Sequence, residues 1–321
     1  MPTPIIATMI GDPSGIGPEI CAKAIVDAGQ AAGRVLLIGS ADAVRQAVDV
    51  GTLPLTVHAM TDVSQAVFES GRVNVLDPGS LTIEQIPTGV ASAACGKAVG
   101  EWIELADTLV ASGEAAAAIM APVNSDALKA AGVVRSIDEL QPPDTSLLRI
   151  SDNLRVLAMS EHLPLREVPQ SVTRQRLERL LELLDRSLRS WGIESARIAV
   201  AGLNPHASGE EEQEHITPAI TAMRAAGLDV TGPISPDAVF RQCVDGQYDV
   251  VVSMYHDQGQ IPLKTVAFHG ACTIYLGLPT LRMSIPQGTA YDIAGKGVAD
   301  PSSMRAAMTV AARLSAGQGF R

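Results

Sequence analysis

Three of the six histidines lie where a catalytic metal could be bound, directly after short apolar runs. These histidines, each with its preceding run, are His162 after 156–160, His206 after 198–203 and His256 after 250–254. In open α/β sheets, ligands bind outside the carboxyl ends of the strands. Three imidazoles there would suit zinc, cobalt or nickel and leave a coordination position open. We expect a shared metal site, with hydrogen-bonded loop histidines as the alternative. The remaining histidines lack this placement: His58, His215 and His269.

Four charged residues could take part in the same chemistry. Lys264, eight residues after the third histidine, could act as a general acid or base or neutralise an anionic substrate. A surface lysine is the alternative. Arg282 stands in an apolar stretch, where a buried guanidinium needs an anion. The nearest carboxylates, those of Asp237 and Asp257, could orient the histidines or hold a substrate hydroxyl.

A glycine-rich loop, GDPSGIGPE at Gly11–Glu19, follows the first apolar run. Pro18 and Glu19 suit the first turn of a helix. The spacing differs from the dinucleotide fingerprint G-x-G-x-x-G, and there is no Walker lysine. The loop is therefore either a tight structural turn or a ligand contact.

Alternating strands and helices must position these residues. The predicted strands are Ile5–Ile10, Arg34–Ile38, Val73–Leu76, Ala116–Ala121, Arg155–Ser160, Arg197–Leu203 and Asp249–Tyr255. The predicted helices are Pro18–Ala28, Ala91–Ser112, Val172–Trp191, Pro218–Ala226 and Ser302–Ser315. In Val172–Trp191, leucines at three-to-four spacing indicate a helix that covers the sheet. This alternation predicts an α/β fold with a largely parallel sheet.

The segment Arg135–Ser151 has the weakest pattern in the chain. Two prolines, Pro142 and Pro143, must break any helix there. A domain junction, a mobile lid and a surface loop are all compatible with it, and the pattern favours the loop.

Composition excludes several classes of function. The chain has 321 residues, which at about 150 residues per domain suggests about two domains. Its 24 basic and 35 acidic side chains give a net charge of −11. This charge and an aromatic content of 3% argue against nucleic-acid binding. No apolar run approaches the roughly 18 residues of a membrane span. Four widely spaced cysteines and the absence of a signal-peptide pattern predict a cytoplasmic protein.

Six motifs together resemble the 4-hydroxythreonine-4-phosphate dehydrogenase family. They are GDPSGIGPEI, APVN, EHLPLREV, GLNPHA, MYHDQG followed by Lys264, and GTAYDIAGKGVAD. The matches run in the family's order from Gly11 to about Asp300, nearly the whole chain.

The resemblance implies an isocitrate-dehydrogenase-like α/β fold with two domains around a cleft. The expected domains are residues 1–125 plus 280–321, and residues 126–279 with the metal ligands and dimer contacts. It also implies a homodimer whose metal site lies at the subunit interface, with one histidine from the partner subunit. The small-molecule substrate, in the type case 4-phosphooxy-L-threonine, would be oxidised at a secondary alcohol with NAD or NADP, and the resulting keto acid decarboxylated.

The resemblance also implies roles for individual residues. The three metal ligands map onto His162, His206 and His256. Zinc is the expected metal, with magnesium, cobalt or nickel as alternatives. Lys264 and Asp257 are the expected catalytic residues. The expected substrate contacts are Arg282, Thr273 and Asp237, and no cofactor-binding residue is assigned.

The chain departs from the family's pattern at several places. The substrate-contacting Gly-His-Thr-Glu segment is replaced by Val134–Leu148, which has no His-Thr pair. After His206 the usual glycine-rich loop is replaced by Ser208-Gly209 and three glutamates. Thr273 replaces a usual asparagine, and Pro286-Gln287 replaces a frequent Asp-His. Two alternatives follow: the same chemistry on a terephthalate-type cis-dihydrodiol or on 4-phospho-D-threonate, or a non-catalytic ligand-binding paralogue.

Overall fold

The computed structural model describes residues 3–266 and 270–320, so His269 lies outside the described residues. The chain divides into two compact units. Unit 1 contains the described residues up to Pro143, together with Leu278–Ala316 and Phe320. Unit 2 contains the described residues of Asp144–Gly277, together with Gly317–Gly319. No helix in either described range is long and apolar enough to cross a bilayer.

Unit 1 is built on parallel strands in the order β3-β4-β2-β1-β5-β12. The strands are β1 (Ile5–Met9), β2 (Arg34–Ile38), β3 (Thr56–Met60), β4 (Arg72–Leu76), β5 (Ala117–Met120) and β12 (Leu281–Ser284). The helices are α1 (Gly17–Ala28), α2 (Ala41–Val50), α3 (Ala93–Ala111), α4 (Ser125–Ala130) and α10 (Ser302–Ser315).

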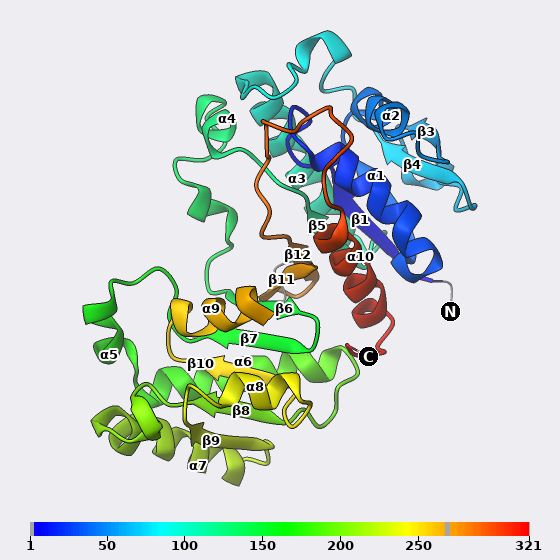
Figure 1. Cartoon of the computed structure of the whole chain (residues 1–321). Coiled ribbons are helices and arrows are strands. Elements are labelled where there is room, and N and C mark those ends of the chain that lie inside the picture. The colour runs from blue at the N-terminus through cyan, green and yellow to red at the C-terminus, as the bar shows by residue number, and fades with distance from the viewer. Residues whose placement is uncertain (1–2, 267–269, 321) are drawn as a thin grey trace. The chain divides into compact units, whose positions relative to one another are not determined.

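The central strands of unit 1 are buried and covered by helices. Figure 1 shows α1 and α10 side by side, and α3 packs on β1 and β5. Two helices begin at serine caps: Ser40 accepts a hydrogen bond from the Ala43 amide, and Ser92 accepts one from the Cys95 amide. Because β1, β2 and β5 are buried on both faces, they read as continuous apolar runs in the sequence.

Unit 2 combines parallel and antiparallel strands in the order β11-β6-β7-β10-β8-β9. The strands are β6 (Ser146–Ser151), β7 (Leu154–Ala158), β8 (Ile198–Ala201), β9 (Val230–Ile234), β10 (Val250–Ser253) and β11 (Ala271–Leu276). The helices are α5 (Val168–Ser171), α6 (Arg174–Ser190), α7 (Thr217–Ala225), α8 (Val239–Val244) and α9 (His256–Val266). β6 pairs antiparallel with both β7 and β11, and the remaining pairs are parallel.

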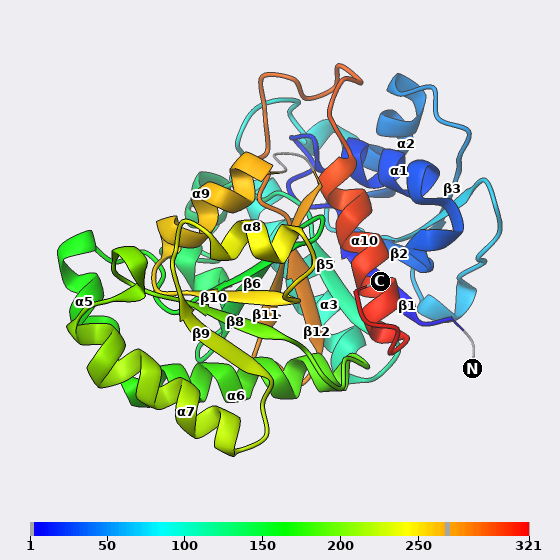
Figure 2. The same cartoon turned by 60° about the horizontal axis from the view of Figure 1, so that its bottom comes forward.

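Helices pack on these strands as the sequence patterns indicate. Figure 2 shows α6 beside α7, and α6 buries the leucines of its apolar stripe: Leu177, Leu180, Leu181, Leu184 and Leu188. This confirms the predicted amphipathic helix, which begins after the capping residue Thr173. On β7, Val156 packs against Gly259 of α9, where any larger side chain would meet the valine. The close approach brings the first turn of α9 toward the end of β7.

The structure confirms the predicted α/β fold but corrects the prediction for its least patterned segment. The interpretation of Arg135–Ser151 as a loop is wrong for its last six residues, which form β6. This strand carries no alternation of polar and apolar residues because most of it is buried. Its strand character depends on antiparallel pairing with β7 and β11, and β11 lies more than a hundred residues later in the chain.

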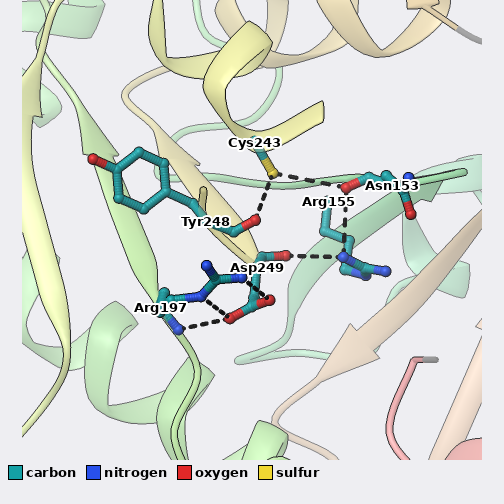
Figure 3. Close-up of polar contacts among 6 residues, drawn as sticks. All are labelled: Asn153, Arg155, Arg197, Cys243, Tyr248 and Asp249. Atoms are coloured by element: carbon teal, nitrogen blue, oxygen red, sulfur yellow. Dashed lines mark hydrogen bonds and ion pairs between the residues drawn. The ribbon is translucent and has the colours of Figure 1, made fainter. Parts of the chain in front are cut away.

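The amino ends of β7, β8 and β10 are joined by a polar network (Figure 3). Arg197 holds both carboxylate oxygens of Asp249, at 3.0 and 3.1 Å. The buried Arg155 donates to the Asp249 carbonyl at 3.2 Å, and Cys243 lies against the carbonyls of Asn153 and Tyr248. Burial raises the pKa of the Cys243 thiol, so the thiol is neutral at physiological pH. The network fixes the strand ends opposite to those that carry the histidines.

Candidate metal centre

The carboxyl ends of β7 and β10 are tied together just before the two histidines. The Met159 amide donates to the Ser253 carbonyl at 2.8 Å, and the buried Ser160 hydroxyl donates to the Met254 carbonyl at 3.0 Å. Gln258 of α9 extends the tie to β8. Its side chain accepts from the Met254 amide at 2.7 Å and donates to the Gly202 carbonyl at 2.8 Å. The three strand ends are thereby held in register.

His162 and His256 come together at this edge with Glu161. The imidazole centroids are 5.1 Å apart. One donor atom from each of the three side chains lies within 4.8 Å of the others. Imidazole nitrogens and carboxylate oxygens are ligand types that a divalent cation such as zinc accepts, so this edge of the sheet is a candidate metal centre.

Asp257 orients the ring of His256. Its carboxylate lies 2.7 Å from Nδ1 of His256, which leaves Nε2 facing away from that contact. Metal-bound histidines usually donate their other ring N–H to a carboxylate in this manner. The contact therefore suits the orienting role considered for Asp257, and its role as a catalytic residue stays a prediction.

Glu161 is itself held by an arginine. Arg149 of β6 donates to both carboxylate oxygens of Glu161, at 2.9 and 2.7 Å. The arginine side chain is only 10% exposed, whereas that of Glu161 is 26% exposed. Such a two-bonded pair is strong and geometrically fixed.

His206 lies in a separate, strained turn after β8, the short helix Pro205–Ala207, and is not a member of the three-residue cluster. Its φ of 59° and that of Ala207, 50°, are both left-handed, a conformation that costs energy in a residue with a side chain. Buried Glu212 stabilises the preceding segment by accepting hydrogen bonds from the amides of Leu203 and Asn204, at 2.7 and 2.8 Å. Strain of this kind is concentrated at functional sites.

Glu212 is charged because of these contacts. Burial alone would raise the pKa of its carboxyl, but hydrogen bonds from Asn204 and Leu203 outweigh it, and the net pKa is lowered. The three glutamates that replace the family's glycine-rich loop thus include one that braces the turn of His206.

The other predicted site residues are spread over both units. In unit 2, Lys264 is exposed near the end of α9, and exposed Asp237 accepts from the Ser235 hydroxyl at 2.7 Å. Thr273 lies in β11 opposite Arg149, so both side chains share one face of the sheet. In unit 1, Arg282 of β12 pairs with Asp107 of α3 at 3.4 Å. Their roles toward a substrate stay predictions.

The glycine-rich loop of unit 1 lines a small, open pocket with a volume of about 30 Å³. The loop itself requires a small residue, because a Cβ at Gly15 would lie 2.6 Å from the Thr289 carbonyl oxygen. The pocket is also lined by Ser14, Thr88 and Gly295. Both interpretations of the loop therefore have support: a tight turn at Gly15 and a surface open to a ligand.

A buried carboxyl lies at the base of the same loop. Asp12 accepts a hydrogen bond from the Tyr291 hydroxyl at 2.6 Å and one from the Ser14 amide at 2.9 Å. Burial raises the pKa of Asp12 despite these contacts. Burial and the neighbouring Asp12 both raise the pKa of the Tyr291 phenol, which is therefore a hydrogen-bond donor at any ordinary pH.

Sequence reasoning missed Arg149, Glu161 and Gln258. Arg149 is a lone cation in the apolar run SLLRIS, the same signal that singled out Arg282. Glu161 immediately precedes a predicted metal ligand. Gln258 lies in the MYHDQG motif, but its link between two strand ends depends on the tertiary structure.

Comparison with families of known proteins identifies one match. The sequence model of the family described as pyridoxal phosphate biosynthetic protein PdxA matches residues 31–311. A Novosphingobium aromaticivorans protein provisionally named 4-hydroxythreonine-4-phosphate dehydrogenase is 40% identical over 318 residues, with 99% of this chain and 96% of that protein covered. A D-threonate 4-phosphate dehydrogenase of Pectobacterium atrosepticum is 36% identical, covering 97% of this chain and 99% of that protein.

Solved structures of proteins with related names have the same fold as this chain. The crystal structure of 4-hydroxythreonine-4-phosphate dehydrogenase from Klebsiella pneumoniae superposes with a TM-score of 0.87 at 36% identity and covers 98% of both chains. A terephthalate 1,2-cis-dihydrodiol dehydrogenase from Burkholderia xenovorans LB400 superposes with a TM-score of 0.70 at 28% identity, covering 97% of this chain and 98% of that one.

Proposed function

The chain belongs to the family of the pyridoxal phosphate biosynthetic protein PdxA, and we propose that it is an NAD(P)-linked, metal-dependent dehydrogenase of a phosphorylated hydroxy acid. Its relatives are named as dehydrogenases of phosphorylated threonine or threonate, and the protein is a dehydrogenase. The observation that carries the metal dependence is the pairing of His162 with His256, whose ring centroids are 5.1 Å apart.

The metal centre is proposed to contain the three histidines predicted from the sequence. A divalent cation there would act as a Lewis acid that polarises the substrate hydroxyl and then the new carbonyl. Asp257 holds His256 in the orientation that presents Nε2, and Glu212 braces the turn that carries His206. The remaining assignments are part of the same proposal: Lys264 transfers a proton, while Thr273, Asp237 and Arg282 contact the substrate. Loss of carboxylate as CO₂ would follow oxidation.

We further propose that the site is completed between two copies of the chain. His206 is not part of the cluster that His162 and His256 form within one chain. Large apolar side chains are exposed in the segments that carry the pair: Leu163 and Leu165 follow His162, and Ile261 lies in α9, which begins at His256. A second copy packed on this surface would bury them and supply the missing ligand.

The domain boundaries and the cofactor site are also proposals. The proposed domains are those expected from the family, residues 1–125 plus 280–321 and residues 126–279, whereas units 1 and 2 divide the chain after Pro143 and after Gly277. The pocket lined by Ser14, Gly15 and Gly295 is proposed to contact part of a nicotinamide cofactor, because glycines let the backbone approach a ligand closely. A cytoplasmic location fits four free, buried cysteines.

Substrate oxidation can be tested directly. With zinc and either NAD or NADP, we expect reduced nicotinamide to form with 4-phosphooxy-L-threonine or 4-phospho-D-threonate. The terephthalate cis-dihydrodiol is expected to be a poorer substrate, because the solved structure named for that activity is the less similar one. The assay follows nicotinamide absorbance, with chelator-treated protein as the control. Metal binding without turnover of any of the three compounds, and without NAD binding in calorimetry, would instead identify a ligand-binding paralogue.

Subunit complementation tests the shared site. His206→Ala and His256→Ala are each expected to bind no zinc, but a refolded equimolar mixture should regain about a quarter of the wild-type sites. The reason is that half of the dimers are mixed and each mixed dimer has one site with no altered ligand. Zinc content of the purified dimers is the measurement. No recovery in the mixture would place both histidines in the same site of one chain.

A further inference from the structure

The Arg149–Glu161 pair lies beside the candidate metal ligands, and no role has been assigned to it. Glu161 is one of three residues whose donor atoms cluster within 4.8 Å, so its carboxylate is a possible third ligand. Both of its oxygens nevertheless accept hydrogen bonds from Arg149. A carboxylate cannot approach a dication fully while a guanidinium occupies both oxygens, because the two cations would repel each other.

The arginine is placed by the strand, not by the carboxylate. Its β6 position is opposite Thr273 of β11 and Val156 of β7, so the backbone that carries the side chain is fixed by pairing on both sides. Val156 in turn packs against Gly259 of α9, the helix that begins with His256. The guanidinium is therefore held on the face of the sheet that α9 covers, close to the histidine pair.

We propose that Arg149 is a positioning residue that keeps the Glu161 carboxylate as its own counter-ion and so prevents it from ligating the metal. The inference rests on the proposed metal-dependent function. An additional anionic ligand would neutralise part of the positive charge of the cation and weaken it as a Lewis acid. Because Arg149 holds the Glu161 carboxylate, the metal ligands are neutral histidines only. The opposite charges of Arg149 and Glu161 cancel each other.

The proposal predicts that removing the positive charge of Arg149 strengthens metal binding. In Arg149→Met, Glu161 is free to bind the metal, and zinc affinity should rise by about tenfold or more. Turnover should fall, because the bound cation is a weaker Lewis acid. In the double variant Arg149→Met/Glu161→Gln, neither charge is present, and zinc affinity should return to within about threefold of wild type.

Competition between the protein and a chromophoric chelator for Zn²⁺ measures these affinities in the full-length protein. The visible spectrum of bound Co²⁺ provides a second readout: it should change in Arg149→Met and return to the wild-type form in the double variant. Arg149→Lys keeps the charge but cannot hold both oxygens, so an intermediate affinity is expected. This variant keeps the test available if Arg149→Met does not fold.

The matched control is another two-bonded pair of unit 2, Arg197 with Asp249, at the opposite strand ends. Arg197→Met should leave zinc affinity unchanged. Zinc binding by the double variant at least tenfold weaker than wild type would overturn the proposal, because it would identify Glu161 as a ligand. An unchanged affinity in both Arg149→Met and Arg149→Lys would overturn it as well. Failure of the wild-type protein to bind zinc would refute both the metal-dependent function and this inference. The other contradicting outcomes would refute the role of Arg149 alone.

Discussion

Replacement of His256 by alanine is expected to abolish stable zinc binding. This residue combines a ring contact with His162, 5.1 Å between centroids, and an orienting carboxylate at 2.7 Å. Loss of an orienting partner alone typically costs 10–100-fold in metal affinity, and loss of a ligand should exceed the upper end of roughly 100-fold. Dehydrogenase turnover should fall with it, since the substrate hydroxyl is no longer polarised. Zinc content after dialysis and the chelator competition are the measurements.

His58→Ala is the control for that experiment. His58 lies in β3 of unit 1 and contacts the Gln65 carbonyl oxygen at 3.1 Å, so its removal tests a histidine without a metal role. Its zinc content should equal that of wild type. Full zinc occupancy in His256→Ala would contradict the ligand assignment, whatever happened to the activity.

The Glu212→Ala variant is expected to lose stability and zinc affinity together. The carboxylate accepts from the amides of Leu203 and Asn204 and from the Asn204 side chain, at 2.7, 2.8 and 2.8 Å. Its removal leaves these half-buried donors without their acceptor and should lower the free energy of unfolding by about 3 kcal/mol. Because the same segment carries His206, the metal centre should weaken as well. Thermal unfolding, followed by zinc titration below the transition, measures both effects.

The effect of Glu212 should depend on pH in a defined direction. Hydrogen bonds hold the pKa of its carboxyl below the ordinary value of 4.5. A lowered folded-state pKa means that the stabilisation is complete above the ordinary value and is lost as the pH falls through the folded-state value. The difference in stability between wild type and Glu212→Ala should therefore be constant near neutral pH and shrink below about pH 4. Glu210→Ala, which changes an exposed neighbouring acid, should show neither effect; a difference that persists unchanged at pH 3 would contradict the argument.

Much of the fold follows from local patterns. The β2 and α10 ranges agree with the predicted ranges residue for residue, and β7, β8 and β10 differ by one or two residues at their ends. Apolar runs bounded by turn residues indicate buried strands, and the leucine spacing of α6 indicates its buried face. The strands that were not predicted are β3, β6, β9, β11 and β12. Length is not the reason, because β6 and β11, with six residues each, are longer than the observed strands that were predicted. β11 and β12 pair with strands more than a hundred residues earlier in the chain, and β3 and β9 are only partly buried.

By itself, the sequence determined that this is an α/β protein of the PdxA family and that three histidines follow strands. These properties are local: a strand end, a turn and a motif each depend on a few neighbouring residues. Only the tertiary structure decided which of these side chains meet. It brings His256 to His162 and leaves His206 in a turn of its own, and it pairs Arg282 with Asp107. It also places Arg149 on Glu161. Such contacts depend on strand register and on the packing of α9 against β7, which join residues far apart in the chain, and no local pattern encodes them.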